Sequence, residues 1–123
     1  MTIILYGIPN CDQVKKAKNW LDEHGIAFLF HDFKKSGLNE SLIRLWLTKH
    51  AWTDLINRKG TTWRKLTESE QLAVNDEQSA IHCMLTNTSV IKRPVLVAQS
   101  RLHTDILVGF SEQTYRRLTG LTS

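Results

Sequence analysis

The N-terminal segment, residues 1–30, carries the pattern that most limits how this chain can fold. A β-branched, apolar stretch, Thr2–Tyr6, predicts a buried strand, which Gly7-Ile8-Pro9-Asn10 then ends. From Cys11 to His24 apolar residues recur on one helical face, and Gly25 is a residue type that commonly follows a helix. Ile26–Phe30 is a second continuous apolar run. Strand, helix and strand in this order predict a βαβ unit with parallel strands.

The rest of the chain continues this pattern with helices, then a hairpin and a last helix. A Thr67-Glu68-Ser69-Glu70 stretch matches the capping box that begins many helices. The expected elements are a helix over 40–50, a loop over 57–62, helices over 68–74 and 76–86, a hairpin of Val95–Ala98 and Ile106–Val108, and a helix from Ser111. This order predicts an α/β, thioredoxin-like fold with a helical subdomain inserted between the second and third strands. We expect a single domain over 1–119, with the insert at about 38–90.

Composition supports a compact domain. The 123 residues are 41% hydrophobic and 23% charged, which argues against a disordered or low-complexity chain. The apolar runs are too short to span a bilayer, and no basic segment precedes Thr2. We therefore expect a cytoplasmic protein without membrane contact. A net charge of +4 favours anionic partners mildly.

Two cysteines are the candidates for chemistry, and their surroundings differ. Cys11 stands at the predicted start of a helix, where unpaired backbone amides and the helix dipole favour the thiolate. Cys83 lies in an apolar helix and is expected to be a small buried hydrophobe. Neither has the spacing of a zinc ligand, so no metal is expected. Because Val14 replaces the second thiol of a Cys-x-x-Cys pair, an adduct on Cys11 needs an external thiol such as glutathione, or Cys83 after a large approach.

Two arginines are candidates to hold an anion beside Cys11. Arg93 precedes Pro94 at the start of a predicted strand, and this X-Pro bond can be cis. Arg58 lies in the polar loop, and guanidinium groups suit carboxylates and oxyanions. The alternative for each is a solvated surface charge. The backbone amides of Asn10 and Asp12 are expected to cradle the sulfur or its partner.

Several segments together resemble the ArsC/Spx family, most closely its YffB-type branch. The segments are Gly7-Ile8-Pro9-Asn10-Cys11-Asp12, Asn57-Arg58-Lys59-Gly60-Thr61-Thr62-Trp63-Arg64, Ile91-Lys92-Arg93-Pro94-Val95 and Leu107-Val108-Gly109-Phe110. The resemblance implies a thioredoxin-like fold and a nucleophilic Cys11. In arsenate reductases of this family three arginines hold the oxyanion, and Arg93 matches one. Asn57 or Arg58 stands at another. The third falls on Gly109, which has no side chain to hold an oxyanion, and this argues against arsenate reduction.

The resemblance leads to one functional reading and two alternatives. The first is a glutathione-dependent thiol–disulfide reductase with a single nucleophilic cysteine, no bound cofactor, and glutathione as co-substrate. Arg93 would act with Cys11 in catalysis, while Asn10, Asp12, Arg58 and Pro94 would contact the substrate. The alternatives are an arsenate reductase served by glutathione or glutaredoxin, and an Spx-like regulator that binds RNA polymerase. Spx-type proteins sense redox state through Cys-x-x-Cys, which Val14 interrupts.

Nucleic-acid binding is not favoured by the aromatic and basic residues. Trp20 and Trp46 fall on predicted apolar helix faces, where packing explains them better than base stacking. The basic residues near Arg58 are read as a solvated loop or as a site for an anionic thiol substrate.

Overall fold

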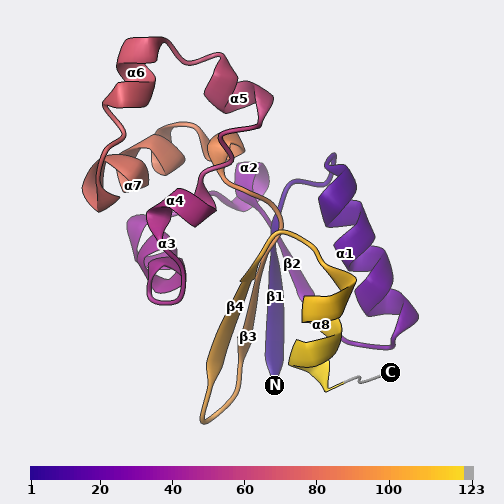
Figure 1. The fold of residues 1–123 in the computed structure, drawn as a ribbon. Helices are drawn as coiled ribbons and strands as arrows, with labels where there is room; N and C mark the ends of the chain where they lie inside the picture. The colour runs from indigo at the N-terminus through magenta and orange to yellow at the C-terminus, as the bar shows by residue number, and fades with distance from the viewer. Residues whose placement is uncertain (121–123) are drawn as a thin grey trace. The chain divides into compact units, whose positions relative to one another are not determined.

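The computed structural model describes residues 1–120 and divides the chain into two compact units. One unit joins Met1–Ser36 to the chain from Arg93 on, and the other is Gly37–Lys92. The first unit holds a four-stranded sheet in the order β2-β1-β3-β4 (Figure 1). Its strands are β1 (Thr2–Gly7), β2 (Leu29–Asp32), β3 (Val95–Gln99) and β4 (Thr104–Val108). β1 and β2 are parallel and the other pairs antiparallel, so the predicted βαβ unit and hairpin are confirmed.

The pairing of β1 with β3 brings two distant parts of the sequence to one end of the sheet. Tyr6, near the end of β1, lies opposite Val95, the first residue of β3. The segment after β1, which leads to Cys11, and the segment before β3, which contains Arg93, therefore leave the sheet from the same end. The Arg93–Pro94 peptide bond is cis. The register thus positions the two residues that the sequence singled out for chemistry.

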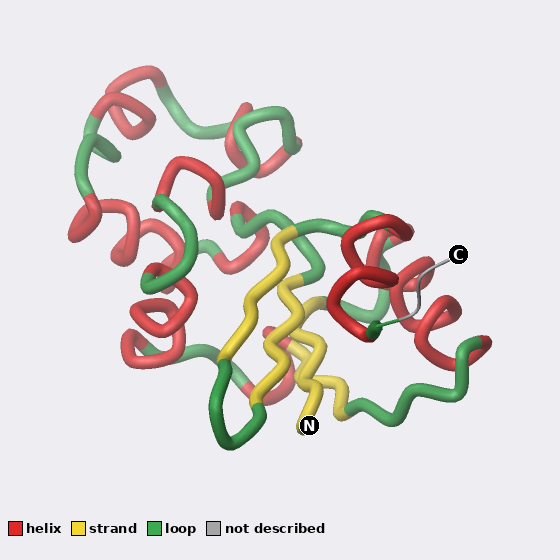
Figure 2. The backbone as a smooth tube through the Cα atoms, turned by 60° about the horizontal axis from the view of Figure 1, so that its bottom comes forward, coloured by secondary structure: helices red, strands yellow, loops and turns green. Residues whose placement is uncertain are grey.

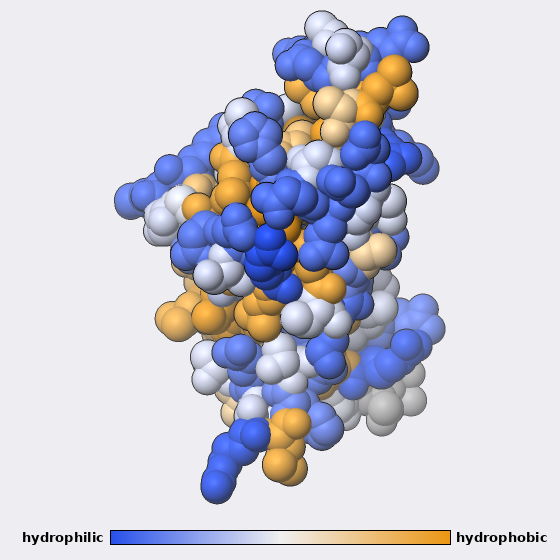
Figure 3. All heavy atoms as spheres, turned by 90° about the vertical axis from the view of Figure 1, so that its left-hand side faces the viewer, coloured by the Kyte–Doolittle hydropathy of each residue, from blue (hydrophilic) through white to orange (hydrophobic). Residues whose placement is uncertain are grey.

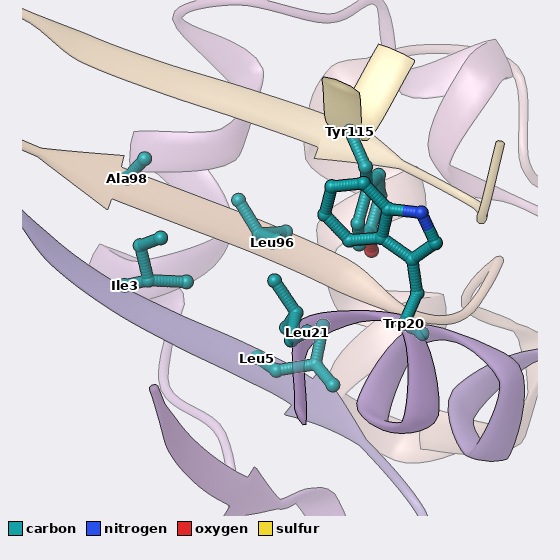
Figure 4. Packing of buried hydrophobic residues seen from close by; sticks show 8 residues of the cluster. Ile3, Leu5, Trp20, Leu21, Leu96, Ala98 and Tyr115 are labelled. Atoms are coloured by element: carbon teal, nitrogen blue, oxygen red, sulfur yellow. The ribbon is translucent and has the colours of Figure 1, made fainter. Parts of the chain in front are cut away.

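Two helices, α1 (Asp12–Glu23) and α8 (Glu112–Thr119), cover one face of this sheet (Figure 1). Alternate strand residues point toward them, as a pleated strand requires. Figure 4 shows the side chains of Trp20 and Tyr115 next to each other and beside Leu96. The two aromatic rings are nearly perpendicular, with their centroids 5.8 Å apart. The buried members of this core are Ile3, Leu5, Ala17, Trp20, Leu21, Leu96, Ala98 and Tyr115.

The second strand begins later than the sequence predicted. The expected strand was Ile26–Phe30, whereas β2 is Leu29–Asp32. The reason is the exit from α1, where Gly25 adopts a left-handed φ of 65° and the Ile26 amide donates to the Leu21 carbonyl at 2.9 Å. Ile26 therefore closes the helix, and pairing with β1 starts only where Leu29 meets Ile4.

The unit Gly37–Lys92 is built from short helices joined by loops (Figure 2). Its helices are α3 (Glu40–Leu47), α4 (Trp52–Leu55), α5 (Thr61–Arg64), α6 (Glu68–Leu72), α7 (Glu77–Thr86) and the 3₁₀ turn η1 (Thr88–Val90). A further single-turn helix, α2 (Phe33–Ser36), follows β2 in the first unit. The predicted helices over 40–50, 68–74 and 76–86 are confirmed, with α3 ending three residues early. The expected loop over 57–62 is wrong at its end, because α5 already begins at Thr61.

Capping and apolar packing explain why the helices of this unit begin where they do. The predicted capping box is present: the Thr67 amide donates to Glu70 Oε1 at 2.9 Å, and the Glu70 amide donates to Thr67 Oγ1 at 3.1 Å. Asp76 and Ser79 form a second box at the start of α7. Trp46 of α3 is fully buried, and Trp20 of α1 is nearly so, which confirms that both pack in cores.

The whole arrangement is a thioredoxin-like α/β fold in which a helical segment separates β2 from β3. Among residues 1–120, the longest helix runs for twelve residues, and none is long and apolar enough to cross a membrane.

The Tyr115 hydroxyl provides a test of the core packing. The side chain is fully buried, and its hydroxyl oxygen has no hydrogen-bond partner among the described residues. Burial raises the pKa of this group, so it stays neutral. Because an unsatisfied buried hydroxyl costs about 1–3 kcal/mol, Tyr115→Phe should leave the free energy of unfolding unchanged or raise it, as measured by urea denaturation. A loss of stability above about 1 kcal/mol would contradict this packing.

Candidate functional site

Cys11 is held at the start of α1 by close packing between the end of β1 and the first turn of the helix. Cys11 is the N-cap residue, with extended backbone angles, and its carbonyl accepts from the Lys15 amide at 3.0 Å. Val14 is fully buried, and a Cβ added to Gly7 would lie 2.7 Å from Val14 Cγ2. Only a glycine lets the strand end approach the helix this closely. The backbone on both sides of Cys11 is therefore fixed.

The environment of the Cys11 sulfur favours the thiolate. Partial burial raises the pKa of the Cys11 thiol, but the other contributions outweigh it and the net pKa is lowered. These are the backbone amides of Val14 and Gln13, a side-chain hydrogen bond from Arg93 and the positive charge of Arg93. The sulfur forms no cap hydrogen bond of standard geometry, as expected for a large and weak acceptor. The amides nevertheless point at it closely enough to stabilise its charge.

The donors to the sulfur differ from those the sequence suggested. Asn10 and Asp12 were expected to supply the backbone amides, whereas Gln13 and Val14 supply them to the sulfur. The reason is the capping geometry, since an N-cap side chain faces the amides of the second and third helical residues. Asn10 lies in the turn before α1, and Asp12 is its first residue. Their contact with a substrate stays a prediction.

Arg93 and Pro94 lie at the same end of the sheet as Cys11. Arg93 is half-buried, and its guanidinium donates to the Cys11 sulfur. The Pro94 carbonyl accepts from the Gly109 amide at 2.8 Å, which links the segment before β3 to the turn after β4. Gly109 has a φ of 79°, a conformation that other residues rarely adopt. Position 109, where the family's arsenate reductases have their third arginine, therefore has a backbone conformation that favours glycine.

Arg58 belongs to the helical unit, and its proposed contact with an anion stays a prediction. Its guanidinium lies 5.7 Å from the ring centroid of Trp52 and 5.9 Å from that of Trp63. These are the outer distances at which a cation still gains from an aromatic face. Asn57, the alternative at this family position, is half-buried, and its side-chain oxygen accepts from the Lys59 amide at 3.2 Å. Asn57 therefore shapes the turn, while Arg58 is exposed.

Cys83 lies in a different environment from Cys11. It is buried on α7, as the sequence predicted, and it is a free thiol. Burial raises the pKa of the Cys83 thiol, and the negative charge of Glu70 raises it further. The two thiols of the chain are thus shifted in opposite directions. Within residues 1–120, no group of three histidine, cysteine or acidic side chains is placed to hold a metal ion.

The opposite shifts predict that the two thiols differ in their pH dependence. Because the thiolate is the reactive form, alkylation of Cys11 by iodoacetamide should reach its midpoint at a lower pH than alkylation of Cys83. Replacing Arg93 by Ala should raise the Cys11 midpoint and leave that of Cys83 in place. Mass spectrometry of the mapped peptides across a pH series measures both. Arg101→Ala, at an exposed arginine of the same unit, is the control. An unchanged Cys11 midpoint in Arg93→Ala would remove Arg93 from the site.

Comparisons with known proteins identify chains that are similar to this one in sequence and fold. A solved structure of a YffB protein is 46% identical, covers 94% of this chain and 97% of its own, and superposes with a TM-score of 0.84. An arsenate reductase (ArsC) related protein from Brucella melitensis is 41% identical over 97% of this chain and 95% of its own, with a TM-score of 0.72. The global transcriptional regulator Spx of Streptococcus pneumoniae is 27% identical over 93% of this chain and 83% of its own.

The family model named for ArsC matches residues 6–118, which include Cys11, Arg93 and Gly109. The match extends over both the sheet unit and the helical unit. This chain belongs to the ArsC family.

Proposed function

We propose that the chain is a glutathione-dependent thiol–disulfide reductase that uses Cys11 as its single nucleophile. The observation that carries the proposal is the surroundings of the Cys11 sulfur, where two backbone amides and the Arg93 guanidinium lower the pKa of a half-buried thiol. Membership of the ArsC family supports a thiol oxidoreductase, since ArsC-related proteins are among its relatives. A thiolate at neutral pH is the form that attacks a disulfide.

The first step is attack of the Cys11 thiolate on one sulfur of a substrate disulfide. An S–S bond forms between Cys11 and that sulfur, and the original S–S bond breaks. The other sulfur leaves as a thiolate and takes a proton from water. When the substrate is a mixed disulfide with glutathione, attack on the glutathione sulfur leaves Cys11 joined to glutathione and releases the reduced substrate.

The second step needs a thiol from outside the chain. Position 14 is a valine, and its side chain is fully buried against Gly7, so α1 offers no resolving thiol. The thiolate of a second glutathione attacks the glutathione sulfur of the adduct, which forms oxidised glutathione and returns the Cys11 thiolate. For a glutathione mixed disulfide, each turnover consumes one added glutathione thiol and releases one reduced substrate thiol and one oxidised glutathione. A glutaredoxin thiol is the alternative donor for this step.

The electrostatics of the site suit glutathione because glutathione is an anion. Arg93 supplies a positive charge beside the sulfur, and its guanidinium matches a carboxylate when the thiolate has been consumed in the adduct. Arg58 is proposed as a second carboxylate contact. The net charge of +4 draws the same class of substrate.

The reductase proposal is tested by turnover of a glutathione mixed disulfide, such as that of 2-hydroxyethanethiol, with glutathione as the reductant. Cys11→Ser should abolish turnover and still fold, as judged by circular dichroism. Cys83→Ser is the matched control and should retain it, because the buried Cys83 takes no part in either step. Intact mass measured after treatment with oxidised glutathione should show a single adduct, mapped to Cys11. Turnover that survives Cys11→Ser would overturn the proposal.

Arsenate reduction is the second candidate, and the Arg93 guanidinium beside Cys11 is the observation in its favour. Against it stands Gly109, where a φ of 79° disfavours any residue that could donate from a side chain. Arsenate-dependent oxidation of glutathione, with and without added glutaredoxin, separates this candidate from a general reductase. A regulatory role in contact with RNA polymerase, suggested by the similarity to Spx proteins, would survive Cys11→Ser in a pull-down with purified polymerase.

A further inference from the structure

A cavity of about 230 Å³ lies in the helical unit, between α6 and α7, in a part of the chain that the proposed chemistry does not use. Its walls come from Leu66 in the loop between α5 and α6, from α6 with the residues that follow it, and from α7 with the residue after it. The lining residues are Leu66, Glu70, Ala73, Val74, Ser79, His82, Cys83, Thr86 and Asn87. Figure 3, which faces this side of the helical unit, shows hydrophobic atoms exposed among hydrophilic ones around α6.

The lining exposes more apolar than polar surface, and two of its hydroxyl groups are already engaged within the chain. Leu66, Ala73 and Val74 supply hydrocarbon, and the buried Cys83 thiol adds a polarizable surface. The Ser79 hydroxyl donates to the Asp76 carboxylate at 2.7 Å, and the Thr86 hydroxyl donates to the His82 carbonyl at 2.8 Å. These hydroxyls thus have partners without any ligand. Most of the contact that a ligand could gain here is therefore apolar.

One lining residue sets the charge that a ligand can carry. Glu70 is the only acidic residue in the lining, and the lining contains no lysine or arginine. One of its carboxylate oxygens, Oε1, accepts from the Thr67 amide. Glu70 lines the same cavity as Cys83, and its negative charge adds to burial in raising the pKa of that thiol. A carboxylate at this position repels anions and attracts a cationic or hydrogen-bond-donating group.

We propose that the cavity between α6 and α7 is a binding site for a small apolar molecule that carries an amine or a hydroxyl group, and not for an anion. The apolar part of the ligand would lie against Val74 and Cys83, and its polar group would face Glu70. The site is independent of the proposed reductase activity. It also differs from the Cys11 site in charge, because Glu70 makes the cavity anionic, whereas Arg93 makes the Cys11 site cationic and suited to anionic substrates.

Three probes of one shape and different charge test this assignment: benzylamine, benzyl alcohol and benzoate. Each is titrated into the ¹⁵N-labelled protein while amide chemical shifts are followed. We expect saturable shifts confined to α6, α7 and Leu66, with a Kd on the order of 1 mM for the amine. Benzyl alcohol should bind more weakly and benzoate not at all. Saturating benzylamine should also slow the alkylation of Cys83 by N-ethylmaleimide and leave Cys11 alkylation unchanged, which provides an internal reference.

Two variants within the cavity test separately the charge of Glu70 and the space that a ligand would fill. Glu70→Gln keeps the capping box, which accepts glutamine, and should abolish the preference for benzylamine over benzyl alcohol. Ala73→Phe, at the C-cap of α6 where the backbone angles are right-handed helical, should raise the Kd of both by about tenfold as its ring fills the space. Leu72→Ala is the matched control, because Leu72 is exposed on α6 and does not line the cavity.

Several outcomes would overturn the assignment. These are shifts that do not saturate, shifts spread over the surface, equal binding of benzoate, or no protection of Cys83 by benzylamine. Protection of Cys11 instead of Cys83 would also overturn it. If Ala73→Phe does not fold, the wild-type titrations and Glu70→Gln still decide the question.

Discussion

The antiparallel register of β1 against β3 is the constraint on which the rest of the site depends. It sets Tyr6 opposite Val95, so the chain after β1 and the chain before β3 leave the sheet together. Cys11 follows the first and Arg93 belongs to the second, although the whole helical unit separates them in the sequence. A shift of the pairing by one residue would reverse the faces of β3 and move Arg93 along the strand. The sheet core of Leu5, Leu96 and Tyr115 therefore stabilises the chemistry as well as the fold.

Much of this architecture could be predicted because its signals are local. The strand of Thr2–Gly7, the apolar face of α1 and the capping box at Thr67 each depend on neighbouring residues, and each occurs where the sequence indicated. Val14 showed directly that no Cys-x-x-Cys pair exists. The position of Cys11 at a helix start could also be predicted from the sequence, because a turn with proline precedes an amphipathic segment. The local signals did not show which arginine acts with Cys11. The family resemblance pointed to Arg93.

Other features depend on geometry that no local pattern records. The start of β2 was misplaced because Ile26 is as apolar as a strand residue, yet its amide closes α1. The amides at the sulfur come from Gln13 and Val14 because capping geometry, and not proximity in sequence, decides which amides face an N-cap side chain. α4 and α5 are single turns, too short to show a helical period. The cavity beside Cys83 arises from the packing of α6 on α7, which residue types alone do not describe.

The packing of Val14 on Gly7 has a consequence for how such proteins diverge. A cysteine is smaller than a valine and would fit the same space, at the cost of the methyl contact with Gly7, about 1 kcal/mol for one buried methyl group. A single codon therefore separates a chain with one thiol, which must rely on a soluble reductant, from one with a dithiol that can store two electrons. The redox chemistry of the site is therefore coupled to a small change in core packing at Val14.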